Sequence, residues 1–154
     1  QLKEAEQGFR NLLEINRKAP SDERLPTNSR YICQAYFGLG RVFHERQSEI
    51  PLKLPPENMG DDLDKKGKLL LSAQRYYLDA LRQHHPHWSM AAGYMIGRLY
   101  EDFYSDIFSA EVPDGLSDEQ VAMYFEELRN KIRPLMKRAL DVYERNHITP
   151  LTSA

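Results

Sequence analysis

Three neighbouring histidines in the sequence are of a type that could bind a metal ion together. His84, His85 and His87 surround Pro86, and neutral imidazole is a common ligand of zinc and copper. Zinc sites in proteins normally include cysteines or paired carboxylates at a regular spacing, and none accompanies these histidines. We therefore predict a histidine-rich turn, no metal site and no bound cofactor.

Two further groups resemble catalytic or metal-binding motifs but are incomplete. Asp61, Asp62 and Asp64 match the start of a calcium loop, yet the later glycine and glutamate are missing, so we expect negative charge at a helix N-terminus instead. His44 and Glu45 lack the second histidine of a zinc-protease helix. The sequence also has no phosphate-binding glycine loop and no nucleophile elbow. We predict that the chain is not an enzyme.

Charge and hydrophobicity exclude two classes of partner. The net charge is −2, whereas binding to nucleic acid normally needs a basic face. A basic run from Arg129 to Arg138 shares its helix with glutamates at ion-pair spacing, which indicates a solvated helix face. No apolar run approaches the roughly 18 to 20 residues of a membrane span. We predict no nucleic-acid partner and no direct membrane contact.

Helices are predicted to position all of these groups, because apolar residues recur at intervals of three and four. The expected ranges are 2–18, 29–48, 62–84, 86–108 and 117–146. Three prolines and a glycine are expected to exclude regular helix from the segment that follows the second range. Ser117 and Gln120 form a capping box, and Pro134 predicts a kink one turn upstream. Cys33, the single cysteine, is expected to be a buried core thiol.

A repeated pattern links two of these helices. It reads Ala35-Tyr36-x-x-Leu39-Gly40-x-x-Phe43 in the first copy and Ala92-Gly93-x-x-Ile96-Gly97-x-x-Tyr100 in the second. Each pattern falls on one helical face, and its glycine allows a partner helix to approach closely. Downstream, the first copy has Ala73, Tyr77 and Ala80, whereas the second has Ile132, Met136 and Ala139. We therefore expect Gly40 and Gly97 to lie at close helix contacts.

This pattern resembles the tetratricopeptide repeat (TPR) family. The resemblance implies an all-α fold, with antiparallel helix pairs stacked as a short solenoid and extended inter-helix loops. It divides a single domain, 1–154, into a trailing helix at 1–18, a repeat at 29–85 and a degenerate repeat at 87–146. Ala5, Phe9 and Leu12 have the spacing of a second helix, so we expect the chain to be part of a longer array.

The family resemblance implies a protein–protein interaction module, an adaptor or scaffold that binds a protein or peptide on its concave face. Residues 109–143 also resemble TPR proteins of the bacterial cell envelope, which favours a periplasmic or envelope location. The alternative is a passive spacer within a longer solenoid. Self-association through the array ends is a further expectation.

By resemblance, the residues beside each glycine face a partner. The predicted binding residues are Phe37, Arg41, His44, Tyr94, Arg98, Glu101 and Asp102, with Gln34, Glu45 and Met95 beside them. Arg41 and Arg98 occupy equivalent places and could hold a carboxylate or an extended peptide. Equally, each arginine could pair with an acid one turn away, Glu45 or Asp102.

Overall fold

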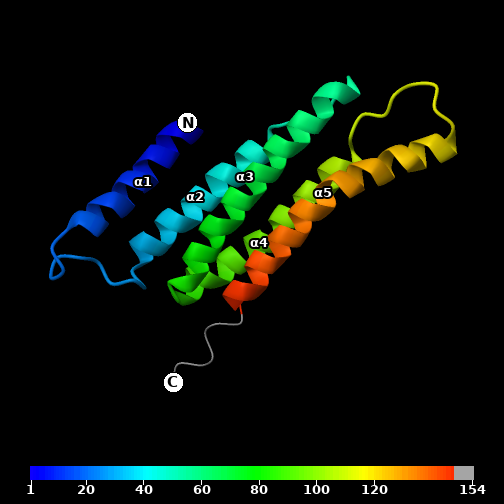
Figure 1. The fold of residues 1–154 in the computed structure, drawn as a ribbon. Coiled ribbons are helices and arrows are strands. Elements are labelled where there is room, and N and C mark those ends of the chain that lie inside the picture. Colours follow the sequence, from blue (N-terminus) through cyan, green and yellow to red (C-terminus); the bar gives the residue numbers. More distant parts are fainter. Residues whose placement is uncertain (148–154) are drawn as a thin grey trace.

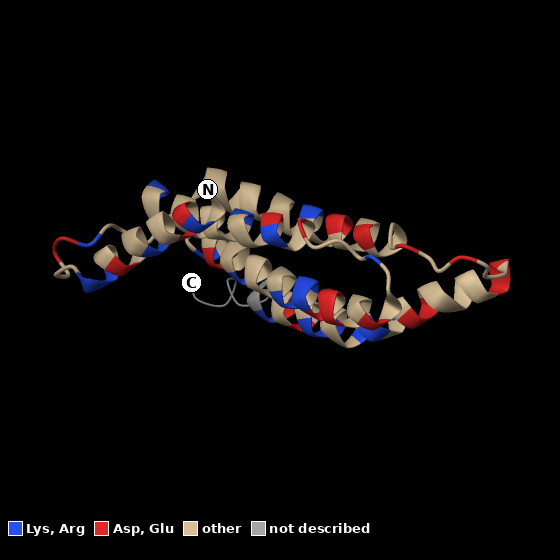
Figure 2. Ribbon diagram, turned by 90° about the horizontal axis from the view of Figure 1, so that it is seen from above, with Lys and Arg blue, Asp and Glu red and all other residues tan. Residues whose placement is uncertain are grey.

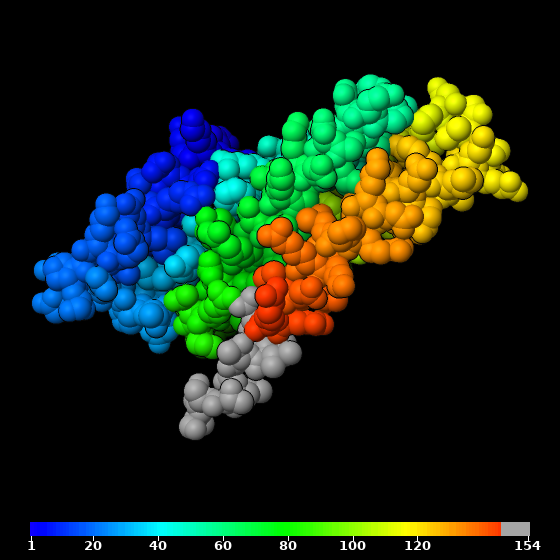
Figure 3. Space-filling model, viewed as in Figure 1, coloured from blue at the N-terminus to red at the C-terminus, as the bar shows by residue number. Residues whose placement is uncertain are grey.

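The computed structural model describes residues 1–147, and every regular element in that range is an α-helix. The helices are α1 (Leu2–Lys18), α2 (Arg30–Ser48), α3 (Pro56–Arg82), α4 (Pro86–Phe108) and α5 (Asp118–His147). Helices α1, α2 and α3 lie side by side in chain order, α4 packs against both α2 and α3, and α5 lies beside α3 and α4 (Figure 1). The space-filling view shows α1 and α5 on opposite sides of the molecule (Figure 3). The predicted all-α class is confirmed.

Local capping chemistry explains where α2 and α5 begin. The Ser29 hydroxyl accepts a hydrogen bond from the backbone N–H of Tyr31 at the start of α2. At α5, the Ser117 hydroxyl accepts from the backbone of Gln120, and the Gln120 amide oxygen accepts from the backbone of Ser117. Each bond satisfies a donor that the helix itself cannot use. The predicted capping box is confirmed.

The expected start of α3 at residue 62 is wrong. The helix begins at Pro56, with Pro55 in an extended conformation before it. Proline suits the first helical position because the N–H that it lacks would have no partner there. The prolines therefore begin the helix, and Asp61, Asp62 and Asp64 lie beyond its first turn rather than at its N-terminus.

The core lies where α2, α3 and α4 meet. Each of these helices buries an apolar stripe at intervals of three and four residues. The buried residues include Leu39 and Val42 of α2; Leu70, Ala73 and Tyr77 of α3; and Ala92, Ile96, Leu99 and Phe103 of α4. Cys33 is fully buried, as expected for a core thiol. The close contact expected at Gly40 is also present, because a Cβ there would lie 2.5 Å from Cδ1 of Tyr77.

The expectation for Gly97 is wrong. Gly97 is exposed, and a Cβ built on it would have no described heavy atom within 4 Å. The closest approach of α5 is to α3 instead, where a Cβ on Gly67 would lie 2.6 Å from Leu135. The Gln74 side chain of α3 also donates to the backbone oxygen of Ala139 at 2.7 Å. The second glycine therefore faces open space between α4 and α5.

Both ends of the helix array have further features. The ribbon of α5 is bent along its length (Figure 1), and Pro134 lies inside this helix. At the other end, α1 places Phe9 over Gly38, and Glu6 accepts from Arg10 and Arg46.

Acidic and basic residues alternate along the helices (Figure 2). In the described range, no helix combines the length and apolar character of a membrane span.

The loops that follow α2 and α4 contact each other. The backbone N–H of Glu111 donates to the Leu52 oxygen at 3.1 Å. The Glu111 carboxylate accepts from the Leu54 backbone at 2.9 Å, and the Glu111 carbonyl accepts from the Tyr124 hydroxyl at 2.8 Å. One residue therefore joins both loops to the first turns of α5.

Candidate interaction surface

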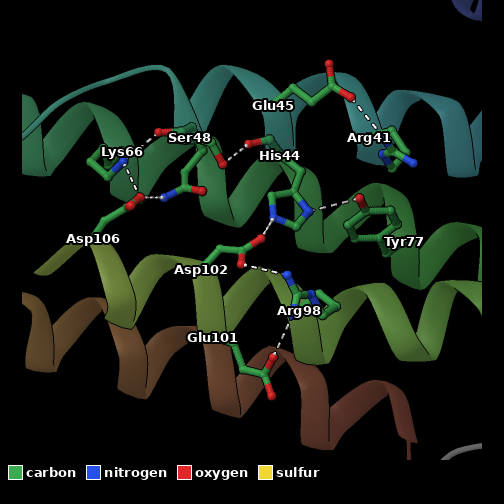
Figure 4. Close-up of polar contacts among 11 residues, drawn as sticks. Arg41, His44, Glu45, Ser48, Lys66, Tyr77, Arg98, Glu101, Asp102 and Asp106 are labelled. Carbon is green, nitrogen blue, oxygen red and sulfur yellow. Dashed lines mark hydrogen bonds and ion pairs between the residues drawn. The ribbon is translucent and has the colours of Figure 1, made fainter. Parts of the chain in front are cut away.

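The structure places the two predicted arginines on neighbouring helices, each already paired with an acid (Figure 4). Arg41 on α2 donates to Glu45 at 2.9 Å. Arg98 on α4 donates to Glu101 at 3.4 Å and to Asp102 at 3.3 Å. Each pair joins two residues of the same helix, and all of these side chains are partly exposed. The second of the two alternatives, pairing one turn away, is therefore present.

His44, by contrast, does not face solvent as a partner-binding residue would. It is 5% exposed, and its two ring nitrogens contact the Tyr77 hydroxyl at 3.2 Å and the Asp102 carboxylate at 2.9 Å. A carboxylate only accepts, so Nε2 carries the proton and Nδ1 accepts from Tyr77. Burial lowers the pKa of His44, although the hydrogen bond to Asp102 opposes this shift. His44 is a neutral link between α2, α3 and α4.

A second buried polar group joins the same three helices (Figure 4). The Lys66 side chain of α3 is fully buried, and its ammonium donates to the backbone oxygens of Gln47 and Ile50 and to the Asp106 carboxylate. These distances are 2.6, 2.9 and 2.8 Å. An ammonium has three donors, and each has an acceptor here. The ammonium therefore binds carbonyl oxygens at the C-terminal end of α2 and links this end to Asp106 of α4.

The two predicted aromatic residues differ in accessibility. Phe37 is partly buried, and its ring lies 5.7 Å from Tyr77 and 5.2 Å from Trp88 between ring centroids. Tyr94 is 68% exposed. Phe37 is thus a packing residue between helices, whereas Tyr94 is free to contact another molecule.

Tyr94 belongs to an exposed apolar stripe along α4. Met90 is 76% exposed, Phe108 is 60% exposed and Tyr104 is 41% exposed. Together with Gly97 and Glu101 between Tyr94 and Tyr104, these positions follow alternating steps of four and three residues, so they share one helical face. We call Met90, Tyr94, Tyr104 and Phe108 the α4 stripe. Four large apolar side chains exposed along one helical face differ from single apolar residues scattered over a surface.

Beside the α4 stripe lies an open groove of about 600 Å³ between α4 and α5. It is mostly apolar. From α4 it is lined by Gly93, Ile96, Gly97, Tyr100 and Tyr104, and from α5 by Arg133, Met136, Lys137, Leu140 and Tyr143. The absent side chain of Gly97 opens its centre. We call this space the α4–α5 groove.

No family model, curated protein or solved structure matches the chain. Within residues 1–147, no group of three or more histidine, cysteine or acidic side chains is placed to hold a metal ion. The α4 stripe and the α4–α5 groove expose large apolar side chains beside an open space.

Sequence reasoning missed the Lys66 link and the α4–α5 groove for different reasons. Lys66 occupies a position of the α3 apolar stripe, between Leu63 and Leu70, and a charged residue in such a stripe is a signal of a buried pair. No sequence pattern indicates the α4–α5 groove, because the groove depends on the distance between α4 and α5 in the fold.

Proposed function

We propose that the chain is a non-catalytic protein–protein interaction module, built as a short stack of TPR-like helix pairs. In this interpretation α2 with α3 forms the first pair, α4 with α5 forms the second, and α1 is the trailing helix of another pair. The packing of α4 against both α2 and α3 supports it. A place in a bacterial envelope assembly is part of the proposal, supported by the resemblance of residues 109–143.

The exposed apolar side chains of α4 carry this proposal. A stripe of Met90, Tyr94, Tyr104 and Phe108 beside an apolar groove leaves a large hydrophobic area in water. Burying such area is favourable by about 25 cal/mol per Å². Aromatic and methionine side chains are also enriched in the centres of protein interfaces. A partner segment that covers this face would therefore gain affinity.

The predicted arginines take a secondary part. Arg98 lies next to the α4 stripe, and its ion pairs with Glu101 and Asp102 are partly exposed. Exposed pairs of this kind are worth about 0–1 kcal/mol, so a partner carboxylate can replace one at little cost. Arg98 can thus orient a partner, while Tyr94 and its apolar neighbours supply the contact area.

Selection of displayed peptides tests the proposal without a known partner. A random peptide library is selected on the wild-type protein, and each enriched peptide is then measured on the double variant Tyr94→Glu, Phe108→Glu. We expect peptides whose affinity falls at least about tenfold on this variant, which corresponds to about 1.4 kcal/mol. The fold of the variant is checked by circular dichroism.

Ile15→Glu provides the matched control, because Ile15 is 71% exposed on α1, far along the chain from the α4 stripe. Peptides that bind the α4 face should retain their affinity for this variant. If every enriched peptide binds the wild type and the α4 double variant equally, the α4 face is not a binding site. The passive spacer role would then be the better interpretation.

A further inference from the structure

We infer that the partner segment is an amphipathic α-helix with acidic residues beside its apolar ridge, contributed by another protein and bound in the α4–α5 groove. This inference rests on the proposed function and adds the chemistry of the ligand. Three features carry it: how the chain fills the equivalent space between α2 and α3, the spacing of the α4 stripe, and the charges at the groove.

The chain itself provides the first argument, because helix α4 already packs against both α2 and α3. It buries a ridge of Ala92, Ile96, Leu99, Phe103 and Ile107. The repeated sequence pattern makes α4 the counterpart of α2, so the α4–α5 groove is the counterpart of the space that α4 fills. A helix is thus the element that this type of surface accepts.

The α4 stripe provides the second argument. From Met90 to Phe108 the exposed face follows steps of four and three residues, the spacing by which one helix packs on another. The stripe spans about five helical turns, or about 27 Å at 1.5 Å per residue. At its centre, Gly97 leaves room for a side chain of the incoming helix.

Charge provides the third argument. Asp106, beside the buried ridge of α4, pairs with the buried ammonium of Lys66 on α3 at 2.8 Å, whereas Asp102 accepts a hydrogen bond from the neutral His44 of α2. The α4–α5 groove offers basic side chains of α5 that could form a pair like that of Asp106 with Lys66. Within the described range Lys137 makes no ion pair, and Arg133 has only a 3.8 Å contact with Glu126. Acidic residues beside the ridge of the bound helix would pair with both.

Three synthetic peptides of about 18 residues, each labelled with a fluorophore, serve as probes of the ligand chemistry. The first has leucines at heptad spacing flanked by glutamates. The second has lysines in place of the glutamates, and the third has the composition of the first in an order without helical periodicity. Binding is followed by fluorescence anisotropy at low and high salt. We expect the first probe to bind at least about tenfold more tightly than the others, with weaker binding at high salt.

Two variants locate the bound helix. Gly97→Leu fills the centre of the groove, and Lys137→Glu reverses a charge at the groove, so each should weaken binding of the acidic probe at least about tenfold. Their matched controls are Gly8→Leu and Lys68→Glu. A Cβ on Gly8 also meets no described heavy atom, and Lys68 is exposed on α3. Both controls should retain wild-type affinity.

The outcomes separate this inference from the proposed function. If the lysine probe or the non-helical probe binds as tightly as the acidic helix, the ligand chemistry is wrong while the binding face stands. The same holds if no probe binds but displayed peptides still depend on Tyr94 and Phe108. If no displayed peptide depends on them either, both proposals fail. Sedimentation that shows a dimer of wild-type protein, but a monomer of Gly97→Leu, would identify a second copy as the occupant instead.

Discussion

The aromatic ring of Tyr77 lies directly against the backbone of Gly40, where a Cβ would come within 2.5 Å of the ring. Tyr77 is fully buried, and its hydroxyl is fixed by His44. The ring therefore cannot turn away without breaking that contact. The buried ring of Tyr77 on α3 leaves no room for a side chain at position 40. At the equivalent Gly97, no described atom would contact an added Cβ within 4 Å.

The two glycines are expected to respond in opposite directions to the same substitution. Gly40→Leu should lower the free energy of unfolding by about 1–3 kcal/mol, the usual cost of overpacking. Gly97→Leu should leave it unchanged or raise it by up to about 1 kcal/mol, because leucine favours helix and meets no obstruction. Thermal melts followed by circular dichroism measure both. Equal losses would show that α5 lies closer to α4 than described.

Removing the buried ammonium of Lys66 should be costly. Lys66→Met leaves the oxygens of Gln47 and Ile50 and the carboxylate of Asp106 without this donor. We expect a loss of about 3 kcal/mol, the lower end for a broken buried pair, because Asp106 is 37% exposed. Urea denaturation measures the change.

The exposed substitution Lys68→Met is the control for Lys66→Met and should change the stability by less than about 0.5 kcal/mol. Adding Asp106→Leu to Lys66→Met should recover part of the loss, because neither charge then lies unpaired. A coupling energy of about 0.5–3 kcal/mol is expected for contacting residues. Strictly additive losses would mean that the two side chains do not interact.

His44 should make the stability depend on pH. Burial holds the pKa of folded His44 below its ordinary value near 6.5. The positive charges of Arg41 and Arg98 also lower this pKa, whereas the contact with Asp102 raises it. As pH falls below about 6.5, the unfolded chain therefore binds a proton at this site before the folded chain does. The stabilisation is present above this pH and is lost as pH falls towards the folded pKa.

Comparison with His44→Gln isolates this contribution. Glutamine can still donate to Asp102 and accept from Tyr77, but it does not titrate. Urea denaturation between pH 7 and pH 5 should show a smaller fall in the free energy of unfolding for the variant than for the wild type. Identical pH dependence would indicate that His44 is protonated as readily in the folded chain as in the unfolded chain.

The histidines around Pro86 should not form a zinc site. His84 adopts a left-handed φ of 57°, which ends α3, and His85 precedes the first residue of α4. These backbone positions make the predicted turn, and among residues 1–147 the three rings do not form a group placed to hold a metal ion. Calorimetric titration with zinc should show no tight one-to-one binding. Tight binding that disappears in His85→Ala, His87→Ala would contradict this expectation.

Helix positions were largely predictable because they depend on neighbouring residues. Ser29, Ser117 and Gln120 act on backbone groups within three residues, so their roles can be inferred locally. The start of α3 was missed because Pro55 and Pro56 suit a helix N-terminus as well as a loop. Deciding between those roles requires knowing what the following turn packs against.

The candidate interaction surface was less predictable because exposure depends on distant parts of the chain. His44 and Glu101 hold equivalent places in the repeat, yet His44 is 5% exposed because α4 covers it, and Glu101 is exposed because no described helix covers that face. The repeat therefore identifies which positions correspond. Only the packing of the helices shows which of the two copies is exposed to solvent.

The contact between the two inter-helix loops has a mechanical consequence. Leu54 and Glu111 are 57 residues apart in the chain, yet the backbone of one donates to the carboxylate of the other. Together with the bond between Leu52 and Glu111, this tie lies at one end of the helix array. It resists sliding of α4 along α2, so tension applied through the α4–α5 segment would be shared with the first helix pair and would not act on one pair alone.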